Sequence, residues 1–241
     1  DQLDHLVHLR VLRTFLNAQP PASDGETVIP PETGDSPNRF EAMAISPADL
    51  RVPDRGRPVR LIQTHDGQLL TGAAQARCRV EDGCLVSDRE GDILKIVVLN
   101  RYQRKPPALG FVRGFGLRRG AIASSVAHDS HNVIAVGVGD ADLVRAINLV
   151  VREKGGMAVA ADDISEILPL PVAGLMTRAD GLETAARYAR LDRLAKSLGS
   201  ALTAPFMTLS FMALPVIPEL KLTDRGLFEL SSFKHVDLYL E

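Results

Sequence analysis

A chain of 241 residues, 45% of them hydrophobic and 24% charged, has the composition of one large globular domain or two small ones. Its formal net charge of −2 at pH 7 argues against nucleic acid and acidic membrane surfaces as partners, because both attract basic chains. No apolar run approaches the roughly 20 residues that cross a bilayer, and the first residues lack the basic start of a signal peptide, so we expect a cytoplasmic protein.

The first 57 residues divide into two stretches of different character. Residues 11–16 alternate as a strand does, and a Ser-Asp-Gly turn follows at residues 23–25. We therefore predict a β-hairpin within residues 1–29. Prolines and polar side chains dominate residues 30–57, which predicts a linker and a domain boundary.

The next part of the chain is predicted to be rich in strands, at residues 58–64, 74–80, 84–87, 93–100 and 109–115. Cys78 and Cys84 flank a turn at residues 81–83. Two cysteines in an intracellular chain are more often free thiols than a disulfide, so free thiols are predicted. With no other cysteine in the sequence, a zinc site built on cysteines is excluded.

The middle of the chain shows a change of period from strand to helix. Residues 121–127 and 133–138 are small or β-branched, as in strands covered on both faces. A helix is predicted next, with Asp140 as its cap and an apolar stripe over residues 143–151. Residues 157–161 return to a strand pattern. Strand, helix and strand at this spacing predict a βαβ unit with a parallel strand pair and a right-handed crossover.

A second helix is predicted over residues 182–198, opened by Asp180 as its cap. Residues 206–241 are apolar, interrupted by prolines, and end in a strand-like stretch at residues 234–240. The elements together predict an α/β fold, or more broadly mixed α+β. A mixed β-sheet flanked by helices would occupy residues 58–241, preceded by the short hairpin.

Two segments invite a binding interpretation, and the chemistry of the first weakens it. Gly137 and Gly139 join a strand to a helix as a dinucleotide fingerprint does. However, Asp140 and Asp142 would place negative charge where the phosphate sits, so helix caps are the preferred interpretation. The apolar segment at residues 205–224 is interpreted as the edge of a core, an interface or the wall of a pocket. It contains one potential ion pair, Glu219 with Lys221.

The strongest concentration of chemistry lies at residues 128–132, between two apolar strands, and consists of His128, Asp129, Ser130, His131 and Asn132. In an extended chain the two histidines would face opposite sides, whereas a turn would let them converge. Histidine and aspartate together suit general acid–base chemistry or a metal. The alternative is a polar network that only holds a turn.

The other histidines carry weaker signals. His5 and His8 are three residues apart and have no acidic partner at ligand spacing, so surface positions are predicted. His65 lies at a turn, and His235 lies on the last predicted strand. Both are interpreted as structural.

Four blocks of sequence carry a resemblance to a known family, at residues 110–132, 168–176, 205–211 and 214–224. Together they resemble the C-terminal portion of bacterial adenine deaminases of the amidohydrolase superfamily, over roughly residues 58–241. The opening residues 1–29 are similar to the end of the small β-domain that flanks the barrel in that superfamily.

The resemblance implies a metal-dependent hydrolase that converts adenine and water to hypoxanthine and ammonia. It also implies a binuclear divalent metal site, with manganese or iron, in an upstream (β/α)8 barrel of the same polypeptide, and a homo-oligomer such as a dimer. The barrel and its His-X-His motif are not in this chain. No metal ligand is therefore assigned here, and the chain alone is expected to be inactive.

Two hypotheses follow for the part of the protein that is in hand. In the first, His128, Asp129 and His131 are accessory catalytic residues, and Ser130 and Asn132 bind substrate, on a turn that closes or supports the active site. In the second, the domain is a structural or oligomerisation module that never contacts substrate, with apolar residues 206–222 as its interface.

Overall fold

The computed structural model describes residues 13–16, 19–24, 26–29 and 34–241, and it divides the chain into two compact units, at residues 1–35 and 36–241. The first unit contains a three-stranded antiparallel sheet. Its strands are β1 (Arg13–Leu16), β2 (Gln19–Ser23) and β3 (Glu26–Thr27). His5 and His8 lie outside the described residues.

The second unit is built on an eight-stranded sheet with the order β13-β12-β10-β11-β8-β9-β4-β5. Its strands are β4 (Val59–Gln63), β5 (Gly72–Ala76), β8 (Leu94–Leu99), β9 (Ala108–Arg113), β10 (Ala121–Ser124), β11 (Val133–Gly137), β12 (Gly156–Ala161) and β13 (Ile164–Pro169). Only the β4–β9 pair is parallel; the other neighbouring pairs are antiparallel. The predicted mixed sheet flanked by helices is confirmed.

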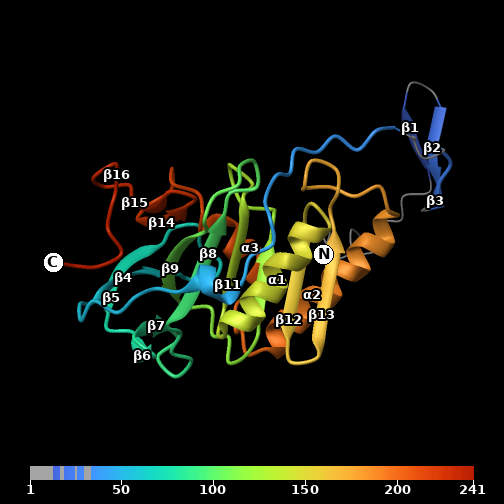
Figure 1. The fold of residues 1–241 in the computed structure, drawn as a ribbon. Coiled ribbons are helices and arrows are strands. Elements are labelled where there is room, and N and C mark those ends of the chain that lie inside the picture. Colours follow the sequence, from blue (N-terminus) through green and yellow to red (C-terminus); the bar gives the residue numbers. More distant parts are fainter. Residues whose placement is uncertain (1–12, 17–18, 25, 30–33) are drawn as a thin grey trace, which may run out of the picture. The chain divides into compact units, whose positions relative to one another are not determined.

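The smaller elements surround this sheet (Figure 1). They are the hairpin β6 (Arg79–Glu81) and β7 (Cys84–Val86), the sheet β14 (Leu220–Thr223), β15 (Gly226–Glu229) and β16 (Lys234–His235), the 3-10 helix η2 (Pro47–Leu50), and the helices α1 (Asp140–Arg152), α2 (Gly181–Ser197) and α3 (Pro205–Phe211). In the hairpin, Asp82 and Gly83 both have positive φ, as a tight two-residue turn requires. Cys78 and Cys84 are free thiols, as predicted.

Both faces of the central sheet are covered. Along β8, Leu94, Ile96 and Val98 belong to one buried cluster, whereas Val97 and Leu99 belong to another. Helix α1 packs on the second face, and α2, α3 and β14 pack on the first (Figure 1). This two-sided burial explains why the central strands are almost uniformly apolar.

The predicted βαβ unit is only partly right. Strands β11 and β12, on either side of α1, run in the same direction because each is antiparallel to β10. They are not neighbours, however, because β10 lies between them. The sequence pattern indicates the crossover but not the strand inserted into it.

Two local predictions about the helices fare differently. Asp180 caps α2 as expected, because its side chain accepts hydrogen bonds from the backbone amides of Leu182 and Glu183. At α1 the cap is Gly139 and not Asp140. Asp140 lies in the first turn, and its carboxylate accepts hydrogen bonds from the Nζ of Lys95.

The predicted pair of Glu219 with Lys221 is wrong, because Lys221 donates to the carbonyl oxygen of Leu69 instead.

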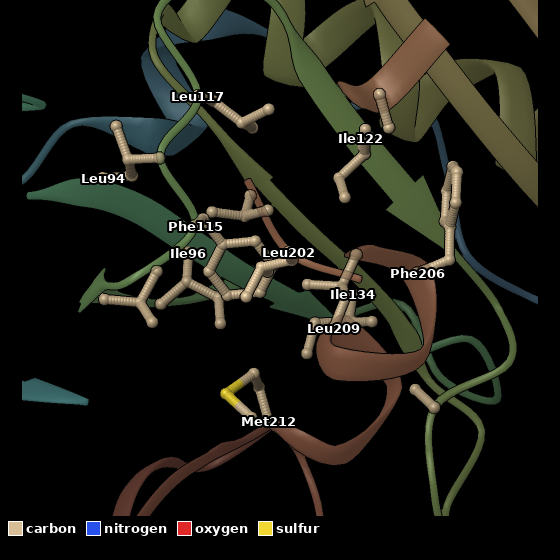
Figure 2. Packing of buried hydrophobic residues seen from close by; sticks show 14 of the residues in the cluster. Leu94, Ile96, Phe115, Leu117, Ile122, Ile134, Leu202, Phe206, Leu209 and Met212 are labelled. Carbon is tan, nitrogen blue, oxygen red and sulfur yellow. The ribbon is translucent and has the colours of Figure 1, made fainter. Parts of the chain in front are cut away.

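The apolar segment near residue 205 contains a helix that the prolines concealed from sequence reasoning. Pro205 occupies the first turn of α3, where its missing amide is not needed. Figure 2 shows Leu209 next to Ile134 of β11, and Phe206, Leu209 and Met212 belong to the same buried cluster as Ile134 and Ile122 of β10. The helix thus belongs to the core, and it ends directly beside the polar segment at residues 128–132.

Residues 36–57, within the predicted linker, belong to the second unit. Leu50 is fully buried, and Phe40, Ala42 and Ile45 pack against the cluster beneath α1. The division between the two units falls after Asp35.

Candidate active-site turn

The polar residues 128–132 form a turn, here called the histidine turn, at one end of the central sheet. The turn connects β10 to β11, and the end of β8 lies beside it because Leu99 pairs with Val133. The chain beyond β13 reaches the same end of the sheet, since Pro169 pairs with Gly156. Segments distant in sequence therefore meet around this turn.

The two histidines lie close together, as expected if residues 128–132 form a turn and not an extended strand. The rings of His128 and His131 meet edge to face, with centroids 5.6 Å apart. Phe211, at the end of α3, also contacts the His128 ring, with a centroid distance of 4.7 Å. The backbone amide of His128 also donates to the carbonyl oxygen of Ser210, 2.9 Å away, which ties the turn to α3.

His131 is held in an environment that favours its neutral form. Burial is the main cause that lowers its pKa, the positive fields of His128 and Arg101 lower it further, and Asp129 acts in the opposite direction. Its Nδ1 atom is buried and has no hydrogen-bond partner in the described structure. The lowered pKa keeps the imidazole mostly neutral at neutral pH, which is the form in which a histidine can act as a general base.

The remaining residues of the turn differ in exposure and use. Asp129 and Ser130 are exposed, and the carbonyl oxygen of Ser130 accepts a hydrogen bond from the hydroxyl of Tyr102. Asn132 is buried, and its Oδ1 accepts the backbone amide of Arg101 at 3.2 Å. The predicted catalytic residues His128, Asp129 and His131 thus lie on one turn. Asn132, predicted to bind substrate, instead uses its side chain to hold the backbone of Arg101.

Several residues around the turn were not predicted from the sequence. Arg101 is buried beside it, and Tyr102 contacts both Arg101 and the turn. Asn100, in the same short stretch, donates to the carboxylate of Asp224 at 2.6 Å. The available signal was a polar Asn-Arg-Tyr triplet directly after an apolar strand, the same kind of signal that drew attention to residues 128–132.

The described residues do not fit a metal centre. Among them, no group of three or more His, Cys, Asp or Glu side chains is arranged to hold an ion. His128 and His131 meet ring edge to ring face, and the Nδ1 of His131 is buried. His65 and His235 are exposed, and the Nδ1 of His235 lies 3.3 Å from the carbonyl oxygen of Leu227.

The glycine-rich connection at Gly137 and Gly139 also has a structural explanation. A Cβ atom on Gly137 would lie 2.5 Å from the Cβ of Ala121, on the neighbouring strand. Asp140 and Asp142 occupy the first turn of α1, where their negative charges interact favourably with the helix dipole and would repel a bound phosphate.

Among the described helices, none is long and apolar enough to cross a membrane.

Comparison with known proteins places this fold in a family. A family model described as the adenine deaminase C-terminal domain matches residues 68–234. A protein named adenine deaminase from Salinibacter ruber is 49% identical over 99% of this chain, which covers 44% of that relative. Relatives of the same name from Methanosarcina acetivorans and Parabacteroides distasonis are 46% and 41% identical, over 99% of this chain and 45% and 44% of their own lengths.

The chain thus spans less than half the length of the curated relatives it matches. The match confirms the resemblance seen in the sequence, and it includes the histidine turn, Arg101 and α3 within one domain. This chain belongs to the adenine deaminase C-terminal domain family.

Proposed function

We propose that the complete polypeptide hydrolyses adenine to hypoxanthine and ammonia, and that this chain closes or supports the active site with its histidine turn. The family match supports the activity, because the relatives that align over nearly the whole chain are named adenine deaminases. The observation that carries the role of the turn is the convergence of His128 and His131 beside the exposed carboxylate of Asp129.

The chemistry of the turn suits proton transfer. Hydrolytic loss of ammonia from a purine requires a proton to leave the attacking water and another to reach the departing nitrogen. His131, whose pKa is lowered chiefly by burial, is kept in its neutral form at neutral pH, and this is the form that a general base needs. His128 lies within ring contact of it, and Asp129 favours the charged form of the imidazole that results. In this proposal the exposed Ser130 forms part of the wall that adenine meets, and the buried Asn132 holds that wall through its bond to the Arg101 amide.

The metal is proposed to lie outside this chain. A pair of divalent ions, manganese or iron, would supply the activated water when bound by the barrel upstream. Among the described residues, no group of three or more His, Cys, Asp or Glu side chains could hold a metal ion. The proposal therefore assigns this chain the positioning of adenine and the movement of protons.

The experiment that tests this role is the substitution His131→Asn in the complete polypeptide. We expect kcat to fall by about 100-fold or more, because general acid–base catalysis contributes that much or more. The melting temperature should change little, because the side chain is only partly buried.

His235→Asn is the matched control, since His235 is exposed on β16 at the edge of a different sheet. Its turnover should equal that of the unaltered enzyme. Normal turnover by folded His131→Asn enzyme would exclude the proposed role of the turn.

A second candidate function is a structural or oligomerisation module, and one surface favours it. Leu69, Leu70 and Met207 are exposed by 45%, 53% and 53%. A cavity of about 150 Å³ lies between the β4–β5 loop and α3, lined by Leu69, Met207 and Phe211 among others. However, most large apolar side chains of residues 206–222 are buried in this chain's own core, which leaves less surface for an interface than the sequence implies.

Sedimentation and activity measurements separate the two functions. A dimer of this chain alone, together with an upstream barrel whose adenine turnover does not depend on it, would favour the module. An upstream barrel that deaminates adenine only when this chain is added would favour the active-site role. The same preparations would report bound metal by elemental analysis.

A further inference from the structure

Arg101 is a charged residue in an unusual setting. Its side chain is only 4% exposed, yet no carboxylate pairs with it within the described part of the chain. Its guanidinium donates to the carbonyl oxygen of Ala173 at 2.6 Å and to the hydroxyl of Tyr102 at 2.8 Å. Its Nε atom is buried without a partner. Burial of an unpaired charge is costly, so the position demands an explanation other than stability.

The segment after β13 is shaped around this guanidinium. Gly174 has a φ of +70°, and a Cβ atom on it would lie 1.8 Å from an Nη atom of Arg101. A side chain there would displace the arginine. The carbonyl oxygen of Gly174 accepts the hydroxyl of Ser125 at 2.6 Å, in the stretch that leads into the histidine turn. The backbone of this segment thus contacts both the arginine and the approach to the turn.

Arg101 and its neighbour Tyr102 hold the histidine turn on both sides of His131. Before it, the hydroxyl of Tyr102 donates to the carbonyl oxygen of Ser130 at 2.8 Å. After it, the backbone amide of Arg101 donates to Oδ1 of Asn132. The Arg101 guanidinium also lies over the Tyr102 ring, 4.7 Å from its centroid, so the two side chains act as one support.

We propose that Arg101 is a positioning residue: with Tyr102 it anchors the histidine turn to the segment after β13 and so fixes how the His128 and His131 rings face each other. The anchoring itself does not depend on the proposed function. Its consequence for catalysis rests on that function, because a displaced proton-transfer group loses activity even when the fold survives.

The charges around His131 make the anchoring measurable. The groups that influence it are His128, Arg101 and Asp129. Helix α3, which packs against the turn, contains no titratable side chain, and neither do residues 170–174. Removal of the Arg101 charge should therefore raise the pKa of His131, because one of the positive fields that lowers it is gone.

The test is the substitution Arg101→Gln in the 241-residue chain, with histidine titrations followed by NMR. His131 is assigned by the loss of its signals in His131→Asn. We expect the pKa of His131 to rise and the proton contact between the His128 and His131 rings to weaken. Arg104→Gln is the matched control, because Arg104 is exposed in the same loop and should leave both readouts unchanged.

Two further variants separate geometry from charge and guard against misfolding. Arg101→Lys keeps the charge but cannot reach two acceptors in the same planar geometry. It should weaken the ring contact while the pKa of His131 rises less than in Arg101→Gln. Tyr102→Phe removes only the hydroxyl shared with Ser130 and should weaken the ring contact in a chain that remains folded.

The inference is overturned if the contact between the His128 and His131 rings stays unchanged in folded Arg101→Gln or in folded Tyr102→Phe, because the pKa of His131 responds to the lost charge whether or not the turn moves. In the complete polypeptide, Arg101→Gln should lower kcat for adenine by about 10- to 100-fold with a smaller change in KM. The proposed function is judged separately by His131→Asn, so it can fail while the anchoring measured by NMR stands.

Discussion

Lys95 and Lys221 are the buried lysines of the described structure, and they differ in what surrounds their ammonium groups. Lys95 is 1% exposed and forms an ion pair of 2.6 Å with Asp140. Lys221 is fully buried and donates only to the carbonyl oxygen of Leu69. Its burial lowers its pKa to about 8. Lys95 is therefore paired at the N-terminal end of α1, whereas Lys221 is a buried charge with no counterion among the described residues.

We expect Lys221→Met to raise the free energy of unfolding at pH 7 by about 1 to 3 kcal/mol, because an apolar side chain of similar length avoids burying the charge. Native Lys221 loses its proton near pH 8, whereas the unfolded chain retains it until about pH 10.5. The unaltered chain therefore gains stability as pH rises through this window. By pH 10 the advantage of the variant should shrink by about 2 kcal/mol.

Urea denaturation at pH 7 and pH 10 measures both effects. Lys95→Met is the control, and it should destabilise by about 1 to 3 kcal/mol because it leaves Asp140 without its partner. Equal destabilisation by the two substitutions would show that Lys221 is not an uncompensated charge.

At the scale of elements, the sequence predicted the strands and helices whose apolar residues follow a clear pattern. The strands near residues 93–100 and 133–138 and the helix from residue 140 appear close to their predicted bounds, because two-sided burial and an amphipathic stripe mark them directly. Helix α3 was missed because it has only seven residues and its apolar face merges with an apolar, proline-rich context. The insertion of β10 between β11 and β12 was missed because local patterns contain no information about strand order.

The glycines before α1 provide a test of an element's packing. Gly137 ends β11 opposite Ala121, where a Cβ atom would have no room, whereas a Cβ atom on Gly139 would meet only Asp142 Oδ2 at 3.9 Å. We expect Gly137→Ala to lower the free energy of unfolding by about 1 to 3 kcal/mol through overpacking. Gly139→Ala should cost less than about 1 kcal/mol, as the loss of a good cap residue. Chemical denaturation of both variants measures these losses. Equal losses in the free energy of unfolding would contradict the close packing at Gly137.

At the scale of the whole molecule, the candidate site is an assembly of segments far apart in the chain. The sequence singled out residues 128–132 because their polar side chains interrupt an apolar pattern. It did not predict that Arg101 and Ser210 bond to this segment, or that Ala173 accepts a hydrogen bond from Arg101, because those contacts depend on which strands and helices meet at one end of the sheet. Local chemistry was therefore predictable, whereas its support required the fold.

The three buried clusters of the described structure lie entirely within residues 36–241. The described core of this unit is therefore built from its own residues, including the segment at residues 36–57 that packs beneath α1. We expect a chain of residues 36–241 to melt within about 2 °C of the 241-residue chain, since a loss of 1 kcal/mol would move a domain of this size by about 2 to 4 °C. The positions of its histidine NMR signals should also match, because the histidine turn and its Arg101 anchor are both retained. A lower melting temperature with shifted His131 signals would show that residues 1–35 help to shape the site, and the division into two units would not extend to stability.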